Sequence, residues 1–361
     1  MTPSETGTTD PSTVVRREAS LPMPTGGKSS IRAIYRDGQG TIHLEWPPEQ
    51  IEAALKDPQG TLWVDLQDEA PQLDGPIGKL LCKVFGFHPL AVEDALAETH
   101  LPKLDDWGEY LYIVFHTIDF DEATDHLRLH ELDIFLGKNF LVTFHKEPAS
   151  PLEQVRRNIE REPSTRVRNG ADHVLYHILD FVVADYLPVI EHLDEAIDSA
   201  QDEVFRQPTR QTLQSIFQIK RSALRLHRVL IPEREVLNRL ARDEYAPIKP
   251  ERRVFFRDVY DHIIRVHDIA ETLRDLIAGA LDTYLSAISN RTNDIMKALT
   301  IATVMFLPMS FLTSFFGMNF FGDNLIFHKS LPRAFLFASS CLIMVTTPIV
   351  MYLWAKRRGW F

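Results

Sequence analysis

The chain has 361 residues, of which 39 are basic and 50 are acidic, so its formal net charge is −11. This acidic balance argues against nucleic acid as a partner, because proteins that bind it carry clusters of Lys and Arg. The two cysteines, Cys82 and Cys341, give neither a disulfide framework nor a CxxC metal motif, which fits a reducing compartment.

The N-terminal segment, residues 1–30, is rich in Ser, Thr, Pro and Gly and has no apolar run. Such a composition predicts a disordered tail and argues against a cleaved signal peptide. Without such a signal, the body that follows is expected to stay in the cytoplasm.

Residues 31–165 alternate between short segments of strand type and of helix type. Strands are predicted where β-branched and aromatic residues gather between turn residues, at 31–35, 41–46, 61–66, 110–118, 127–135 and 140–144. Helices are predicted at 48–55, at 80–85 and after His88. This mixture indicates a cytoplasmic α/β domain built in layers.

Residues 166–297 have the periodicity of helices instead, with apolar positions three or four residues apart from Asp172 onward. A second helix is predicted at 209–242, before Pro247 and Pro250. From Glu251 the next proline is Pro308, so one helix is expected to run from there into the apolar C-terminal region. At 1.5 Å per residue it would be about 100 Å long, which indicates a long helical stalk.

Two apolar segments follow, residues 298–316 without any charged residue and residues 331–354 with only Arg333. About 20 apolar residues suffice to cross a bilayer, so both are predicted to be transmembrane helices. The fold class expected for the whole chain is therefore an α+β membrane protein.

The charges that flank the two apolar segments predict their orientation. Lys297 precedes the first segment, and the tail, residues 355–361, contains Lys356, Arg357 and Arg358. Because positive residues stay on the cytoplasmic side, both termini are expected inside and the loop, residues 317–330, outside.

Polar and small residues form a stripe along the first of these segments. The stripe consists of Asn293, Met296, Thr300, Thr303, Ser310, Ser314 and Gly317. Such a stripe on a membrane helix faces either a neighbouring helix or water. Two helices cannot enclose a wet path, so either several copies assemble around an axis or the helices only anchor the chain.

The motif Gly317-Met318-Asn319 closes the first apolar segment. Its context is Tyr284-Leu285-Ser286, Asn293-Asp294-Ile295-Met296, Pro308 and Phe316, followed by a short loop and a last helix. Together with His88-Pro89-Leu90 and with Phe256 to His262, this arrangement resembles the CorA family of magnesium channels over residues 31–361.

The resemblance implies a funnel-shaped homopentamer in the inner membrane, with the first membrane helix lining the pore. Gly317, Met318 and Asn319 would form the selectivity filter, where amide oxygens hydrogen-bond hydrated Mg²⁺ without stripping its water. The other family positions that line the pore are Asn293, Met296, Leu299, Leu307 and Ser310, and helical spacing adds Thr303.

The resemblance also implies regulation by Mg²⁺ on the cytoplasmic side. Asp94 and Asp258 match the positions of a sensor in which the ion bridges carboxylates of neighbouring subunits. Lys356, Arg357 and Arg358 would surround the inner mouth of the pore, although binding of anionic lipid is an equally simple role for them.

The expected function is Mg²⁺ influx driven by the membrane potential, which supplies about 4.6 kcal/mol per divalent ion at 100 mV. No enzymatic activity or organic cofactor is expected. Such transport needs no nucleotide, and consistent with this the sequence has no Walker loop. One departure from the family follows the motif, where Phe320 to Leu325 replace the usual Met-Pro-Glu-Leu stretch. Together with His328 it leaves two alternatives open, a Zn²⁺, Co²⁺ or Ni²⁺ transporter, with or without proton coupling, and a non-conducting membrane-anchored scaffold.

Overall fold

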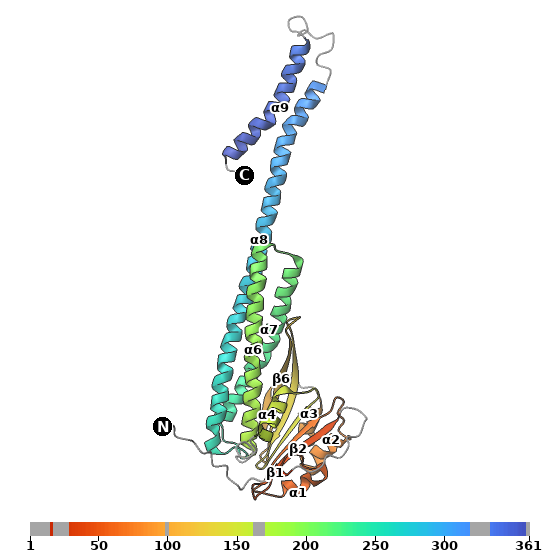
Figure 1. Cartoon of the computed structure of the whole chain (residues 1–361), viewed down its shortest axis with the longest axis vertical. Helices are drawn as coiled ribbons and strands as arrows, with labels where there is room; N and C mark the ends of the chain where they lie inside the picture. Colours follow the sequence, from red (N-terminus) through yellow and green to blue (C-terminus); the bar gives the residue numbers. More distant parts are fainter. Residues whose placement is uncertain (1–14, 17–28, 98–100, 162–169, 318–332, 359–361) are drawn as a thin grey trace, which may run out of the picture. The chain divides into compact units, whose positions relative to one another are not determined.

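The computed structural model describes residues 15–16, 29–97, 101–161, 170–317 and 333–358 (Figure 1). They fall into two compact units. Unit 1 takes in the chain up to Glu203 together with Thr209–Leu281, and unit 2 takes in Val204–Pro208 and Asp282–Phe361. Each unit is described by itself below.

Unit 1 contains one mixed β-sheet. Its strands lie in the order β1-β3-β2-β4-β8-β7-β6-β5. β4 and β8 pair in parallel at the centre, and β1 pairs in parallel with β3, whereas the other neighbours are antiparallel. The strands are β1 (Val15–Arg16), β2 (Ser30–Arg36), β3 (Ile42–His43), β4 (Thr61–Gln67), β5 (Lys103–Asp106), β6 (Leu111–Asp121), β7 (His126–Leu136) and β8 (Phe140–His145).

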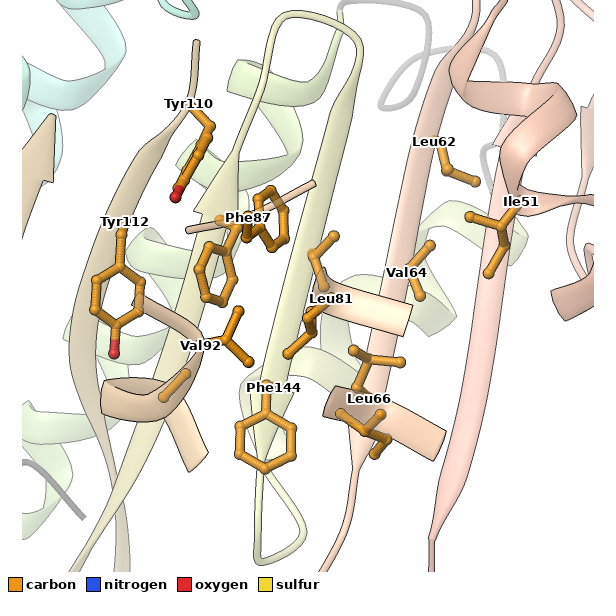
Figure 2. Close-up of a cluster of buried hydrophobic side chains, with 14 of the residues drawn as sticks. Ile51, Leu62, Val64, Leu66, Leu81, Phe87, Val92, Tyr110, Tyr112 and Phe144 are labelled. Atoms are coloured by element: carbon orange, nitrogen blue, oxygen red, sulfur yellow. The ribbon is translucent and has the colours of Figure 1, made fainter. Parts of the chain in front are cut away.

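Short helices cover one face of this sheet. They are η1 (Pro48–Gln50), α1 (Ile51–Leu55), α2 (Pro76–Lys79), η2 (Leu80–Val84) and α3 (Pro89–Leu96). Figure 2 shows the core between the two layers, in which Leu62, Val64 and Leu66 of β4 pack with side chains of the helices. Phe87 lies between η2 and α3 and stacks on Phe135 of β7 at 4.3 Å between ring centroids. Burial of each such side chain contributes about 1.5–3 kcal/mol, so this core fixes the layer that carries α3.

The remaining helices of the chain are longer. They are α4 (Ser150–Arg161), α6 (Ala171–Arg206), α7 (Arg210–Arg242), η3 (Pro250–Arg252), α8 (Arg253–Gly317) and α9 (Arg333–Arg357). Helix α7 docks on the sheet through its arginines, because Arg225 donates to the carbonyl of Leu127 and Arg239 to that of Leu104, both at 2.8 Å. Alternate residues of β4, among them Trp63, are covered by α4, whose Arg156 lies over the Trp63 ring. The central strands are thus buried on both faces.

A buried polar contact joins α6 and α7 to β6. Glu233 is wholly buried, and its Oε1 accepts hydrogen bonds from the Tyr186 hydroxyl at 2.9 Å and the His116 amide at 3.0 Å. The Tyr186 hydroxyl also lies within hydrogen-bond distance of the His116 carbonyl, at 2.7 Å. Burial raises the pKa of Glu233 well above its ordinary value, and these hydrogen bonds offset only part of the rise. Burial therefore favours the neutral form of this carboxyl group.

The structure differs from the sequence-based expectation in three places. The strand expected at 41–46 is limited to Ile42–His43, because the chain bends at Leu44 and Glu45 ahead of two prolines. The sequence pattern predicts neither β5 nor α4, both of which are present. Two residues of the expected tail form β1, and the rest of that tail lies outside the described residues.

Helix α8 continues from unit 1 into unit 2 and ends at Gly317. The most apolar segment of α8 has no buried residues. In the most apolar segment of α6, by contrast, 56% of the residues are buried, as in a core helix. In α9 the segment Ala338–Trp354 is also apolar. Side chains such as Phe306 and Phe311 of α8 and Leu342 of α9 are about two-thirds exposed. An apolar surface of this kind requires lipid or protein against it.

Candidate pore helix and cation sensor

The expected pore-lining residues that precede the predicted filter all lie on α8. They are Asn293, Met296, Leu299, Thr303, Leu307 and Ser310. Successive members are three or four residues apart, so they share one side of the helix. Met296, Leu299 and Leu307 are 57%, 62% and 66% exposed, which leaves this side open to a partner or to solvent.

Two threonines on α8 have their hydroxyl protons engaged within the helix. Thr300 donates to the Met296 carbonyl at 2.8 Å and Thr303 to the Leu299 carbonyl at 2.9 Å. A hydroxyl whose proton is used in this way presents only acceptor lone pairs outward. This side of α8 therefore offers oxygen acceptors, with which the water shell of a cation can hydrogen-bond.

The predicted filter is only partly within the described residues. Gly317 is the last residue of α8, and a Cβ built on it would meet no atom within 4 Å. Met318 and Asn319 lie outside the described residues, as does the loop with Asp323 and His328. The filter thus stays a prediction from the sequence.

The two expected sensor carboxylates lie on different elements of unit 1. Asp94 is on α3, with half of its side chain exposed, and Asp258 is on the outer surface of α8. Within the described residues, no group of three or more His, Cys, Asp or Glu side chains is placed to hold a metal ion. A site made from Asp94 and Asp258 therefore needs ligands from a second copy or from water.

A lysine that the sequence reasoning did not single out contacts Asp94. Lys103 Nζ lies 2.6 Å from Asp94 Oδ2 and 3.1 Å from Asp105 Oδ2. Burial lowers the pKa of Lys103, but the two carboxylates raise it more, so the net shift is upward. The sequence signal that could have identified this contact is the i, i+2 spacing of Lys103 and Asp105, which places both side chains on one face of a strand.

The basic residues expected at the inner mouth form the end of α9. Lys356 and Arg357 occupy its last turn and Arg358 follows, and all three are exposed. The Arg358 guanidinium lies 5.5 Å from the centroid of the Trp354 ring. Cations at a helix C-terminus also complement the helix dipole.

Comparison with known proteins decides the family. The model of the family described as "CorA-like Mg2+ transporter protein" matches residues 58–357, which is most of the chain. The chain belongs to the CorA-like Mg²⁺ transporter family. The CorA match covers both expected sensor carboxylates, Lys103, and helices α8 and α9 as far as Arg357.

CorA proteins of known name and structure agree with this assignment. The cobalt/magnesium transport protein CorA of Thermotoga maritima is 34% identical over 277 residues, which is 76% of this chain and 77% of that protein. A putative metal ion transporter of Bacillus subtilis is 30% identical over 282 residues, or 78% and 85% of the two chains. The complete structure of CorA from Methanocaldococcus jannaschii matches with a TM-score of 0.75 at 22% identity, covering 92% of this chain and 99% of that one. The sheet domain followed by long helices is thus a CorA fold.

Proposed function

We propose that this CorA-like protein conducts Mg²⁺ into the cytoplasm, with the membrane potential as the driving force. The observation that carries the proposal is the C-terminal part of α8, whose surface is apolar and unburied but has the acceptor oxygens of Thr300 and Thr303 on one side. Residues 298–316 and 331–354 span the inner membrane with both termini in the cytoplasm. Relatives named for magnesium and cobalt transport support this reading.

The conducting form is a homopentamer, in which α8 of each copy faces the central axis. A single α8 and α9 cannot surround a hydrated ion, and the exposed apolar side chains of α8 need a partner. Assembly satisfies both requirements, since neighbouring copies cover the apolar sides while the acceptor side faces water. The remaining apolar surface of α9 faces lipid.

The proposed ion path uses neutral oxygens rather than carboxylates. Mg²⁺ dehydrates reluctantly, so a ring of Asn319 amides at the outer mouth selects the hydrated ion. Asn293, Thr303 and Ser310 accept hydrogen bonds from its water shell along the helix. Met296, Leu299 and Leu307 form apolar constrictions that close by dewetting.

Gating follows the cytoplasmic concentration of the ion. In the closed state Mg²⁺ lies between Asp94 of one copy and Asp258 of its neighbour. When the ion leaves, the two carboxylates repel each other and the ring loosens. Lys356, Arg357 and Arg358 face the inner mouth, where they also contact anionic headgroups.

Flux into liposomes tests the proposal. Purified protein is reconstituted with an internal Mg²⁺-sensitive dye, and a negative internal potential is imposed. Asn319→Ala is expected to abolish Mg²⁺ entry, while Asn324→Ala, in the same loop but outside the motif, retains it. Equal flux through Asn319→Ala and the unchanged protein would refute the filter assignment.

A second candidate cargo is Co²⁺, because the Thermotoga maritima relative is named for cobalt as well as magnesium. Competition of Mg²⁺ flux by Co²⁺, Zn²⁺ and Ni²⁺, with and without a pH gradient, separates these cargoes. Absence of flux for every metal, from protein that is pentameric in the liposomes, would instead identify a non-conducting scaffold.

A further inference from the structure

The carboxylate assigned to the sensor already holds a cation that belongs to the protein. Lys103 Nζ lies 2.6 Å from Asp94 Oδ2, which is the distance of a charge-assisted hydrogen bond. The same ammonium lies 3.1 Å from Asp105 Oδ2. Lys103 of β5 therefore contacts one carboxylate on α3 and one on its own strand.

The Lys103 ammonium also packs against a side chain of the buried core. Its nitrogen lies 4.9 Å from the centroid of the Tyr112 ring, which is wholly buried. The Tyr112 hydroxyl in turn donates to Asp133 Oδ1 at 2.6 Å. The Lys103 side chain is only 28% exposed, so it is held in place rather than free in solvent.

An ordinary surface ion pair on the same domain shows the contrast. Lys56, the residue after α1, contacts Glu52 of that helix at 2.8 Å, but both side chains are at least 66% exposed. Such a pair constrains neither partner and contributes little. Lys103 differs because it has two carboxylate partners, an aromatic platform and partial burial.

We propose that Lys103 is an internal counter-ion of the sensor, which sets the divalent-cation concentration at which the sensor fills. The inference rests on the sensor role proposed above for Asp94. A divalent cation that binds Asp94 must displace this ammonium or share the carboxylate with it, and the two cations repel at such short range. Lys103 thereby weakens the site for divalent cations.

The same contact acts in the empty sensor. Without a bound ion, Lys103 neutralises part of the charge on Asp94 and so reduces its repulsion from Asp258 of a neighbouring copy. Removal of the ammonium should then strengthen the repulsion in the empty state and the binding in the filled state. The stronger repulsion favours the open ring while the sensor is empty, and the tighter binding shifts closure to lower Mg²⁺ concentration. Neither effect changes the identity of the cargo.

The test uses the full-length protein in detergent micelles, with protection from chymotrypsin as the measure of ring closure. Chymotrypsin is chosen because it cleaves mainly after aromatic residues and leucine, so substitution of Lys103 changes none of its principal sites. Lys103→Gln should lower the half-protective Mg²⁺ concentration about two- to tenfold, in proportion to the loss of one partly buried ion pair. Lys103→Met, which keeps the contact with the Tyr112 ring but not the charge, should do the same.

Two control variants isolate the charge, and a third separates the two proposals. Lys103→Arg should stay within about twofold of the unchanged protein, because a guanidinium keeps the positive charge. Lys56→Gln should have no effect. Asp94→Asn should raise the half-protective concentration, and if it does not, the sensor assignment itself fails.

The role of Lys103 would be overturned if the half-protective Mg²⁺ concentration is unchanged or raised in both Lys103→Gln and Lys103→Met. If Asp94→Asn raises that concentration in the same experiment, the sensor assignment is retained. Melting temperatures of the variants without Mg²⁺ verify that each is folded. Should Lys103→Gln fail to fold, Lys103→Met alone decides.

Discussion

Substitution of Glu233 by glutamine tests whether the buried contact between α6, α7 and β6 holds a neutral carboxyl group. Burial raises the pKa of Glu233 in the folded chain, and in the unfolded chain the group titrates near its ordinary value of 4.5. Above that pH the unfolded chain releases a proton that the folded chain retains. Rising pH therefore favours unfolding, up to the pKa of the folded state.

The magnitude follows from proton linkage. Each pH unit between the two pKa values costs the native chain about 1.4 kcal/mol of stability. Glutamine has no proton to release, and its carbonyl oxygen still accepts from the Tyr186 hydroxyl and the His116 amide. The stability of Glu233→Gln should therefore be close to that of the unchanged protein at pH 5 and should exceed it increasingly as the pH rises.

Thermal unfolding of the full-length protein in detergent at pH 5, 6, 7 and 8 measures this gain. For a domain of this size, the advantage of Glu233→Gln should grow by about 3–6 °C per pH unit. Glu235→Gln is the matched control, because Glu235 is exposed on the same helix and should show no such trend. A difference that is the same at every pH would refute the neutral carboxyl group and imply that Glu233 is ionised in the fold.

Three further substitutions have expected outcomes of their own. Phe87→Ala empties the centre of the core and should cost about 3–5 kcal/mol in denaturant unfolding, and a loss below about 1 kcal/mol would contradict that packing. Burial raises the pKa of Asp65, but its contacts with His145 and Arg156 lower it more, so the pKa lies below its ordinary value. Asp65→Asn should thus cost about 3–5 kcal/mol at pH 7, and the cost should fade as the pH drops below about 3.8, whereas a pH-independent loss would contradict this. Thr209 caps α7, so Thr209→Ala should lower the melting temperature by the equivalent of about 1 kcal/mol while Thr209→Ser does not.

The elements that sequence patterns predict well are those with one dominant signal. The strands at 61–66 and 140–144 are runs of β-branched, aromatic and leucine residues, interrupted only by Asp65, and both are buried central strands. Strand β5 reads Lys-Leu-Asp-Asp, which is mostly polar, because it lies at the edge of the sheet. Only its pairing with β6 makes it a strand, and such pairing is a tertiary effect that local propensity does not contain.

Some residues of the candidate site could likewise be predicted from the sequence, whereas others could be found only from the fold. The pore positions come from the family resemblance, with Thr303 added by helical spacing, and the family match covers them. The partner of Asp94 could be identified only from the structure, because Lys103 lies on a different element, β5. The polar contact of Glu233 with β6 spans 117 residues of sequence, and no periodicity points to it. The filter and the pentamer are proposals that rest on the sequence and the family.

The parallel pairing of β4 with β8 has a consequence for synthesis of the chain on the ribosome. Asp65 of β4 and Thr143 of β8 form a hydrogen bond across the sheet, although 78 residues separate them. At about 5–20 residues per second, β4 waits about 4–16 s before its partner emerges. During that time one edge of an apolar strand is unpaired and open to association with other nascent chains. Chaperone dependence in the cell should therefore be greatest while residues 67–145 are being translated.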